Sequence, residues 1–287
     1  MDRLNAQRDG LLQRLRDYGS CAVAFSGGVD SSVVAQAARL ALGDRAVAMT
    51  AVSASLAEGE LPAARRVAQQ IGIRHLELST REFANPAYLQ NGPDRCYHCK
   101  SELYERMAQA AGPLGLAVLV NGANLDDVGD YRPGMEAARQ VGVRSPLIEC
   151  QLGKRDVRAL AQHWELPVWD KPAAPCLSSR VAYGEPVTPE RLAMIDQAER
   201  FLRSLGTGEV RVRYHAGDVA RIEVPPDDLA RLASLPLRTQ LAARLRDLGF
   251  RFVTLDLDGF RSGSLNHLLA PESLVLKPSP DLPVRGS

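Results

Sequence analysis

Short apolar runs alternate with amphipathic segments through the first two thirds of the chain. Five runs have the length and composition of buried strands: 22–25, 46–52, 76–78, 117–120 and 146–148. Between them apolar residues recur at helical spacing, as at Leu61, Ala64, Val67 and Ile71. Strands that alternate with helices predict an α/β fold with a doubly wound parallel sheet, whose ligands bind at the carboxyl ends of the strands.

The alternation stops at residues 171–187, a stretch rich in proline and glycine that we interpret as a junction loop. After it a helix, two alternating strands, a leucine-rich helical stretch and a last strand predict a second, smaller α+β domain of order αββαβ. We therefore divide the chain into a first domain (1–170), the junction loop (171–187), the small domain (188–260) and an irregular tail (261–287).

Composition and charge exclude several classes of protein. Lys and Arg number 35 against 34 Asp and Glu, so the overall charge gives no reason to expect a nucleic acid or an anionic membrane as partner. The chain has no uninterrupted apolar stretch of the ~18 residues that a membrane span needs, and its polar start is unlike a signal peptide, which predicts a cytoplasmic protein. Five cysteines in a chain of this length favour reduced thiols over a disulfide framework.

The clearest chemical motif directly follows the first apolar run and precedes a helical run. It comprises Ser26, Gly27, Gly28, Val29, Asp30, Ser31 and Ser32. Small residues in such a turn let backbone N–H groups approach a phosphate at the positive end of a helix. The alternative is an ordinary glycine turn with a serine cap, but a strand before the motif and a helix after it favour the phosphate site.

This motif resembles the SGGxDS loop of the PP-loop superfamily, whose members split ATP between its α and β phosphates. A Walker A loop would place a lysine after the glycines, and here no lysine occurs before Lys100. A second turn, 121–127, is similar to one that superfamily members place beside the nucleotide, and it contributes Asn124 and Asp126. The resemblance implies AMP transfer from ATP, with Mg²⁺ held by Asp30 and Asp126 to offset the charge of the leaving pyrophosphate.

Four further segments, 94–100, 131–134, 175–180 and 211–215, narrow the resemblance. Together they resemble the LarE family of ATP-dependent sulfur transferases over nearly the whole chain, up to about residue 260. The resemblance implies adenylation of a carboxylate of pyridinium-3,5-biscarboxylic acid mononucleotide and its conversion to a thiocarboxylate, a step in building the nickel-pincer nucleotide cofactor of lactate racemase. It further implies a small-molecule nucleotide substrate, a homo-oligomer formed through the small domain, and a downstream nickel-insertion protein.

Within this resemblance Cys176, in the junction loop, is our candidate for the catalytic, sulfur-handling residue, and the nearby Arg180 is a cation that would lower its pKa. The alternative for Cys176 is a packed structural thiol. Arg211 and Arg213 lie on one face of a predicted strand, where with Arg180 they suit a substrate phosphate; the alternative is a solvated strand face.

Two sources of sulfur remain open. Cys96, Cys99 and Cys176 could together hold a [4Fe–4S] cluster whose open iron binds sulfide, or Cys176 could attack the adenylate and give up its own sulfur. The alternatives for the first two cysteines are a pair at the start of a helix with no ligand and a half zinc site. The resemblance also assigns Glu199 and Glu223 to a carboxylate cluster that holds metal or orients the substrate.

Three rival functions use the same phosphate loop. A tRNA-thiolating enzyme also adenylates before it adds sulfur, but the balanced charge and the lack of an added basic module argue against RNA. An ammonia-using ligase would not need Cys176, and an adenine-nucleotide sensor would bind ATP without releasing pyrophosphate.

Overall fold

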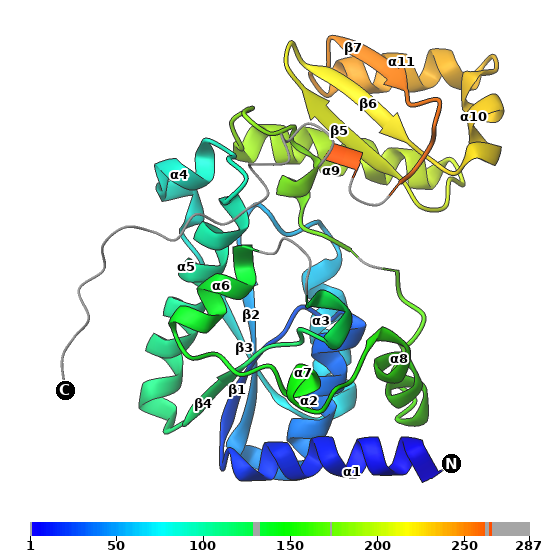
Figure 1. The fold of residues 1–287 in the computed structure, drawn as a ribbon. Coiled ribbons are helices and arrows are strands. Elements are labelled where there is room, and N and C mark those ends of the chain that lie inside the picture. The colour runs from blue at the N-terminus through cyan, green and yellow to red at the C-terminus, as the bar shows by residue number, and fades with distance from the viewer. Residues whose placement is uncertain (1, 129–132, 173, 262–263, 266–287) are drawn as a thin grey trace.

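The computed structural model describes residues 2–128, 133–172, 174–261 and 264–265 (Figure 1). Tyr131 and Arg132 of the 131–134 segment, and nearly all of the 261–287 tail, lie outside the described residues. None of the described helices is long and apolar enough to span a membrane.

The first sheet is parallel and has the strand order β3-β2-β1-β4. Its strands are β1 (Cys21–Ala24), β2 (Ala46–Val52), β3 (Arg74–Ser79) and β4 (Val118–Val120). The predicted fifth strand at 146–148 is wrong, because this run forms the short helix α7 (Pro146–Glu149). Pro146 stands at the first helical position, where its missing N–H costs nothing. The chain pairs with β4 only just before this helix, through an isolated bridge between Arg144 and Val120.

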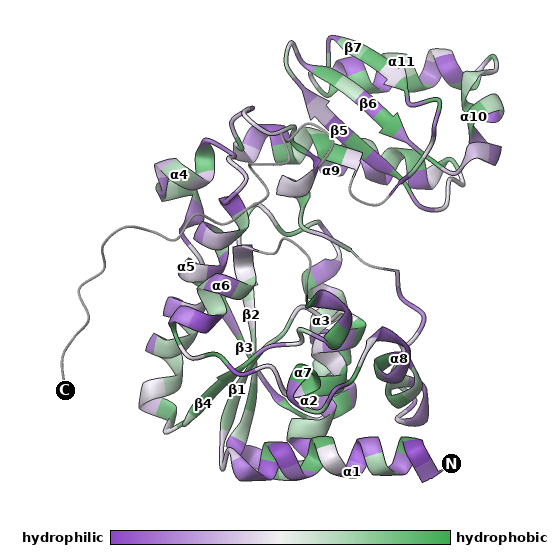
Figure 2. Cartoon of the chain, in the orientation of Figure 1, coloured by the Kyte–Doolittle hydropathy of each residue, from purple (hydrophilic) through white to green (hydrophobic). Residues whose placement is uncertain are grey.

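Helices cover both faces of this sheet (Figure 1), which confirms the doubly wound α/β fold. One face packs against α1 (Asp2–Asp17), α2 (Val29–Leu42), α3 (Glu60–Ile71), α7 and α8 (Lys154–His163), and the other against α5 (Arg95–Ala111) and α6 (Pro133–Gln140). Within β1, Cys21 and Val23 belong to the first cluster and Ala22 to the second, as alternation along a strand requires. Figure 2 shows the hydrophobic residues concentrated along the strands between these two helical layers.

A second sheet of order β5-β6-β7 lies in the small domain. Its elements are α9 (Pro189–Ser204), β5 (Arg211–His215), β6 (Val219–Glu223), α10 (Pro226–Ala233), α11 (Leu237–Asp247) and β7 (Phe252–Leu255). Two helices stand where the sequence predicted one, so the observed order is αββααβ. Pro236 separates them, because proline lacks the N–H that a continuous helix would need there.

The junction loop is more ordered than its composition indicated. Leu177–Arg180 forms a 3-10 turn, η5, and Val181 bridges to Tyr214 of β5. Leu177 packs in the hydrophobic cluster of the small domain, and so does Tyr88 of α4 (Pro86–Leu89), which belongs to the first part of the chain. The junction loop is therefore held by apolar contacts from both sides.

Candidate active site

The phosphate loop joins the carboxyl end of β1 to α2 and is shaped by its small residues. Gly27 has a φ of +68°, and a Cβ there would lie 2.9 Å from the Cα of Ala64 in α3. The Ser31 hydroxyl donates to the Gly28 carbonyl oxygen (3.1 Å) and accepts the Ser26 N–H (3.2 Å). The loop is thus closed on itself by a side chain that the sequence motif supplies.

The second turn packs directly on this loop. A Cβ at Gly122 would lie 2.8 Å from the Ser31 backbone nitrogen, so only glycine allows the approach. The Asn124 amide donates to Asp30 Oδ1 (3.1 Å), and its own oxygen accepts the Asp126 N–H (2.9 Å). The two turns that the sequence placed beside the nucleotide therefore touch, and they bring two carboxylates to one edge of the sheet.

A lysine that the sequence analysis missed completes this edge. The Nζ of Lys154 lies 2.5 Å from Asp30 Oδ2, and its backbone N–H donates to Asp126 Oδ2 (2.7 Å). Lys154 is the first residue of α8 and stands 124 positions after Asp30, so no local motif could have signalled it. One residue thus contacts both carboxylates that were predicted to hold Mg²⁺.

Ser32 is the least accessible of the expected phosphate ligands. It is fully buried, and its hydroxyl has no hydrogen-bond partner within the described parts of the chain. A buried hydroxyl without a partner is costly in a folded protein, so a binding function gives this serine a reason to be there.

Three thiols gather between α5 and the junction loop. Cys96 and Cys176 are exposed, while Cys99 is partly buried. Burial first, and then the charges of Cys176 and Cys96, raise the pKa of Cys99 to about 12 against the opposing charge of Lys100. Burial acts to lower the pKa of Lys100, but Tyr104 and the three thiols reverse the effect and raise it. The three cysteines are thus close enough to influence one another and a shared cation.

These thiols do not stand at metal-ligand spacing. Over residues 2–128, 133–172, 174–261 and 264–265, no group of three or more His, Cys, Asp or Glu side chains is placed to hold a metal ion. The [4Fe–4S] set and the carboxylate metal site therefore stay predictions.

A buried arginine ties the helix of Cys96 and Cys99 to the loop of Cys176. Arg95 donates to the Asn91 side-chain oxygen (2.5 Å) and to the Ser178 carbonyl oxygen (2.7 Å). Asn91 in turn donates to the Ala182 carbonyl oxygen (2.8 Å), and Tyr88 and Ser178 share a hydroxyl contact of 2.6 Å. These bonds fix the position of the junction loop relative to α5.

Arg180 holds the backbone of Cys176 and is itself paired. Its guanidinium donates to the carbonyl oxygens of Pro175 and Cys176, and its Nε lies 3.0 Å from Glu199 Oε1. From the sequence, we expected this charge to lie beside the Cys176 thiol. In the structure the guanidinium instead contacts the loop backbone and Glu199, so its charge is largely offset there.

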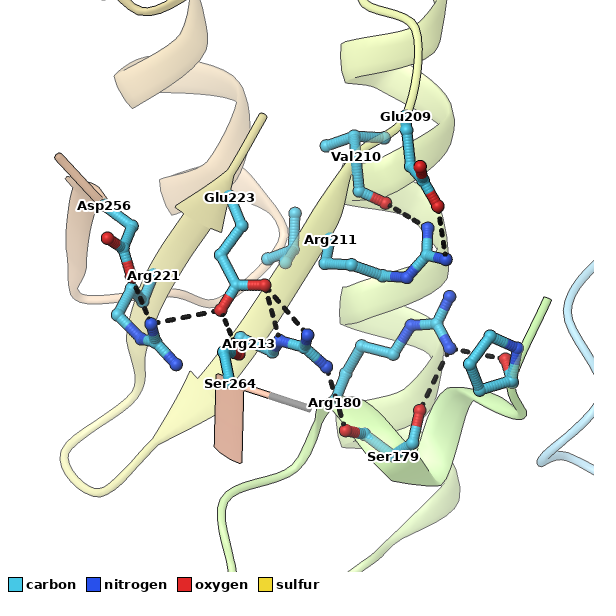
Figure 3. A network of polar contacts seen from close by, with 12 residues as sticks. Ser179, Arg180, Glu209, Val210, Arg211, Arg213, Arg221, Glu223, Asp256 and Ser264 are labelled. Carbon is cyan, nitrogen blue, oxygen red and sulfur yellow. Dashed lines mark hydrogen bonds and ion pairs between the residues drawn. The ribbon is translucent and has the colours of Figure 1, made fainter. Parts of the chain in front are cut away.

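Arg211 and Arg213 do share one face of β5 (Figure 3), but both residues are buried. Arg213 forms a two-pronged contact with Glu223 (3.0 and 2.8 Å) and donates to the Ser179 carbonyl oxygen (3.1 Å). Arg211 donates to the Val210 carbonyl oxygen (2.8 Å), and burial followed by the charge of Arg180 lowers its pKa. The solvated-face alternative is thus wrong.

Glu199 and Glu223 are both nearly inaccessible and each is held by its own arginines. Glu199 binds Arg180, Arg203 (2.7 Å) and the Val212 N–H (3.1 Å). Glu223 binds Arg213 and Arg221, as Figure 3 shows. The two carboxylates thus offset part of the positive charge of the arginine group, which we define as Arg180, Arg211 and Arg213.

Comparison with known proteins agrees with this geometry. Residues 8–104, which include the phosphate loop, match the family model described as asparagine synthase. An uncharacterized protein of Synechocystis is 46% identical over 266 residues, covering 93% of this chain and 99% of its own length. One component of the glutamine-hydrolyzing GMP synthase of Archaeoglobus fulgidus is 26% identical over 203 residues, 66% of each chain.

A third relative is more informative, because its name states an activity. The pyridinium-3,5-bisthiocarboxylic acid mononucleotide synthase of Lactiplantibacillus plantarum is 39% identical over 278 residues, which cover 96% of this chain and 99% of the relative. Identity at this level over the full length of both proteins confirms the resemblance that the sequence segments indicated. The chain belongs to the LarE family, that of the pyridinium-3,5-bisthiocarboxylic acid mononucleotide synthases.

Proposed function

We propose that the chain is an ATP-dependent, AMP-forming sulfur transferase. It adenylates a carboxylate of pyridinium-3,5-biscarboxylic acid mononucleotide and converts that carboxylate to a thiocarboxylate. The observation that carries the proposal is that two candidate groups lie beyond the carboxyl ends of neighbouring strands. The phosphate loop directly follows β1, and the loop of Cys176 reaches the segment after β2, where the Leu177 N–H donates to the Ser55 carbonyl oxygen (3.0 Å).

In the first half of the reaction the substrate carboxylate attacks the α phosphorus of ATP. The new bond joins a carboxylate oxygen to that phosphorus, and the bond to the bridging oxygen breaks so that pyrophosphate leaves with the electron pair. The backbone donors of 26–32 bind the phosphates. Mg²⁺ would offset charge on the leaving group, and the adjacent Asp30 and Asp126 fit the one or two carboxylates that Mg²⁺ usually takes beside phosphate oxygens.

The second half needs a sulfur nucleophile, because the mixed anhydride of a carboxylate and AMP is a good acyl donor. Cys176 is exposed at the start of η5, and the hydrogen bonds from Arg180 to the preceding carbonyl oxygens hold its backbone. Attack by its thiolate displaces AMP and leaves a thioester. A base then removes the Cα proton of residue 176, and the Cβ–Sγ bond breaks with its electron pair on sulfur. This β-elimination releases the thiocarboxylate and leaves dehydroalanine at position 176.

The alternative route uses sulfide held on a [4Fe–4S] cluster by Cys96, Cys99 and Cys176. The mutual influence of the three thiols, with Arg95 and Lys100 as nearby cations, supports their convergence. When bound, the cluster would supply an exchangeable sulfide and leave Cys176 intact. Anaerobic reconstitution with iron and sulfide, followed by iron analysis and mass spectrometry of the Cys176 peptide, distinguishes the two routes. Iron uptake with an intact peptide supports the cluster, and loss of hydrogen sulfide without iron supports the sacrificial route.

The arginine group fits the substrate phosphate. Burial first, and then the charges of the nearby Arg180 and Arg213, lower the pKa of Arg211. A bound phosphate would relieve that repulsion, and guanidinium groups bind phosphate well. We further propose a homo-oligomer and a downstream nickel-insertion protein as partners, both on the strength of the family alone.

The experiment that tests this function is incubation with ATP, Mg²⁺ and the biscarboxylated mononucleotide. We expect AMP and pyrophosphate in equal amounts only when the mononucleotide is present, and a product in which sulfur replaces oxygen. AMP formation that is independent of the mononucleotide would contradict the proposed substrate.

An ammonia-using ligase is the second candidate, because the Archaeoglobus relative is named a GMP synthase. That similarity is lower and covers less of the chain than the similarity to the Lactiplantibacillus protein. The Cys176→Ala variant separates the two functions. Our proposal predicts pyrophosphate release and an adenylated mononucleotide without a sulfur-containing product, whereas an ammonia-using enzyme would keep full turnover with ammonium.

A further inference from the structure

The phosphate loop has no lysine of its own, yet one ammonium group reaches it from elsewhere in the chain. Lys154 begins α8, and its Nζ lies 2.5 Å from Asp30 Oδ2 in the first turn of α2. Its backbone is fixed separately, because its N–H donates to Asp126 Oδ2 at 2.7 Å. The lysine is therefore anchored at its backbone, while its four-carbon side chain can rotate.

A purely structural role explains this ion pair poorly. The side chains of Lys154 and Asp30 retain 36% and 25% of their exposure, so the pair lies at the open edge of the fold. Exposed ion pairs of this kind contribute only about 0–1 kcal/mol to stability. Asp30 is held in place in any case, because its other oxygen accepts from Asn124 (3.1 Å).

The same position is well suited to a phosphate chain. Without nucleotide, Lys154 offsets the charge of Asp30 beside the turn that presents its N–H groups to phosphate. When Mg²⁺ and a nucleotide bind, the cation takes over the charge of Asp30, and the Lys154 ammonium is free to leave Asp30 and bind a phosphate oxygen. Rotation about its side-chain bonds allows this exchange while its backbone N–H stays hydrogen-bonded to Asp126.

We propose that Lys154 is a catalytic residue of the adenylation step: its ammonium moves from Asp30 to the phosphates that leave as pyrophosphate. This deepens the proposed function and rests on it. As the carboxylate oxygen bonds to the α phosphorus, the electron pair of the breaking bond passes to the pyrophosphate. The charge of Lys154 stabilises that leaving group without forming a bond to it or transferring a proton.

The test measures binding of pyrophosphate and of ATP, each with Mg²⁺, by calorimetry. We expect Lys154→Met to weaken both roughly tenfold or more, as the loss of a charged hydrogen bond predicts. The matched control is Arg155→Met, which removes one positive charge from the same helical turn. Arg155 is exposed and makes no side-chain hydrogen bond or ion pair with other described residues. Its substitution should change neither affinity by more than about twofold.

A double-mutant cycle with Asp30→Asn separates direct contact from an indirect effect through Asp30. Pyrophosphate binding is measured with EDTA, so that no metal contributes. The proposal predicts that Lys154→Met weakens binding in the Asp30→Asn background as well. Equal affinity of Asp30→Asn and Asp30→Asn/Lys154→Met would show that Lys154 acts only by holding Asp30, and the proposal would be wrong.

These experiments do not depend on the identity of the acceptor. If pyrophosphate binding depends on Lys154 but the biscarboxylated mononucleotide stimulates no AMP, the substrate is wrong and the role of the lysine stands. If the mononucleotide is adenylated normally by Lys154→Met, with pyrophosphate affinity unchanged, the function stands and the role of the lysine falls.

Discussion

The two glycines of the phosphate loop should respond differently to the same small substitution. Gly27→Ala places a methyl group at a φ of +68°, which costs about 1–2 kcal/mol in an L residue. The same methyl would lie 2.9 Å from the Cα of Ala64, and overpacking against backbone costs about a further 1–3 kcal/mol. Together these terms predict a loss of roughly 2–5 kcal/mol in the free energy of unfolding.

Gly28→Ala should leave the fold intact, because its φ is −84° and its nearest contact would be the Ser26 hydroxyl at 3.4 Å. Its methyl group would, however, stand at the helix start where the phosphate approaches. We expect the free energy of unfolding to change by less than about 0.5 kcal/mol and ATP affinity to fall at least about tenfold.

The assay is urea unfolding of each variant, with ATP binding by calorimetry. Gly72→Ala is the control for backbone strain alone, because its φ is +70° in the left-handed region and a Cβ there meets nothing within 4 Å. Gly27→Ala should therefore be less stable than Gly72→Ala by the packing cost. Equal stability of these two variants would refute the close approach of α3, and wild-type ATP affinity in Gly28→Ala would refute the phosphate loop.

Three further predictions concern groups around the site. Burial lowers the pKa of His75 below 6.5, so the unfolded chain binds more protons than the folded protein in this range, and the free energy of unfolding should fall as the pH drops below 6.5. A His75→Asn variant that keeps the same pH dependence of stability between pH 5 and 7 would contradict this. The rate at which Cys99 reacts with iodoacetamide should keep rising up to pH 10, because its pKa is about 12. A rate that levels off near pH 8 would show that the thiol is not buried as described. Glu199→Gln should lower the free energy of unfolding, measured by urea denaturation, by about 3–5 kcal/mol, because it leaves the buried Arg180 without its charged partner. A loss under about 1 kcal/mol would mean that another group offsets the charge of Arg180.

Contiguous features of the sequence predicted the fold well, and with it the turn between the first strand and the first helix of the sheet. Residues 26–28 form that turn and residues 29–32 begin α2, and because their chemistry is local, their position after a strand and before a helix could be inferred directly. The run at 146–148 failed because three apolar residues after a proline fit a strand or a helix start equally well.

Long-range pairing could not be inferred in the same way. Alternation correctly placed Arg211 and Arg213 on one face of β5, but it carries no information about what covers that face. The partners Glu199 and Glu223 come from another helix and another strand, and Lys154 comes from far along the chain. Side chains that meet only in the folded state leave no periodic signal.

The central claim is that a substrate carboxylate is joined to AMP before sulfur replaces its oxygen. The most direct test is to label the carboxylate oxygens of the mononucleotide with ¹⁸O and to analyse the AMP by mass spectrometry. Because the attacking oxygen stays on phosphorus when sulfur displaces AMP, the account predicts one labelled oxygen in each AMP released. Substrate-dependent AMP that carries no label would contradict it.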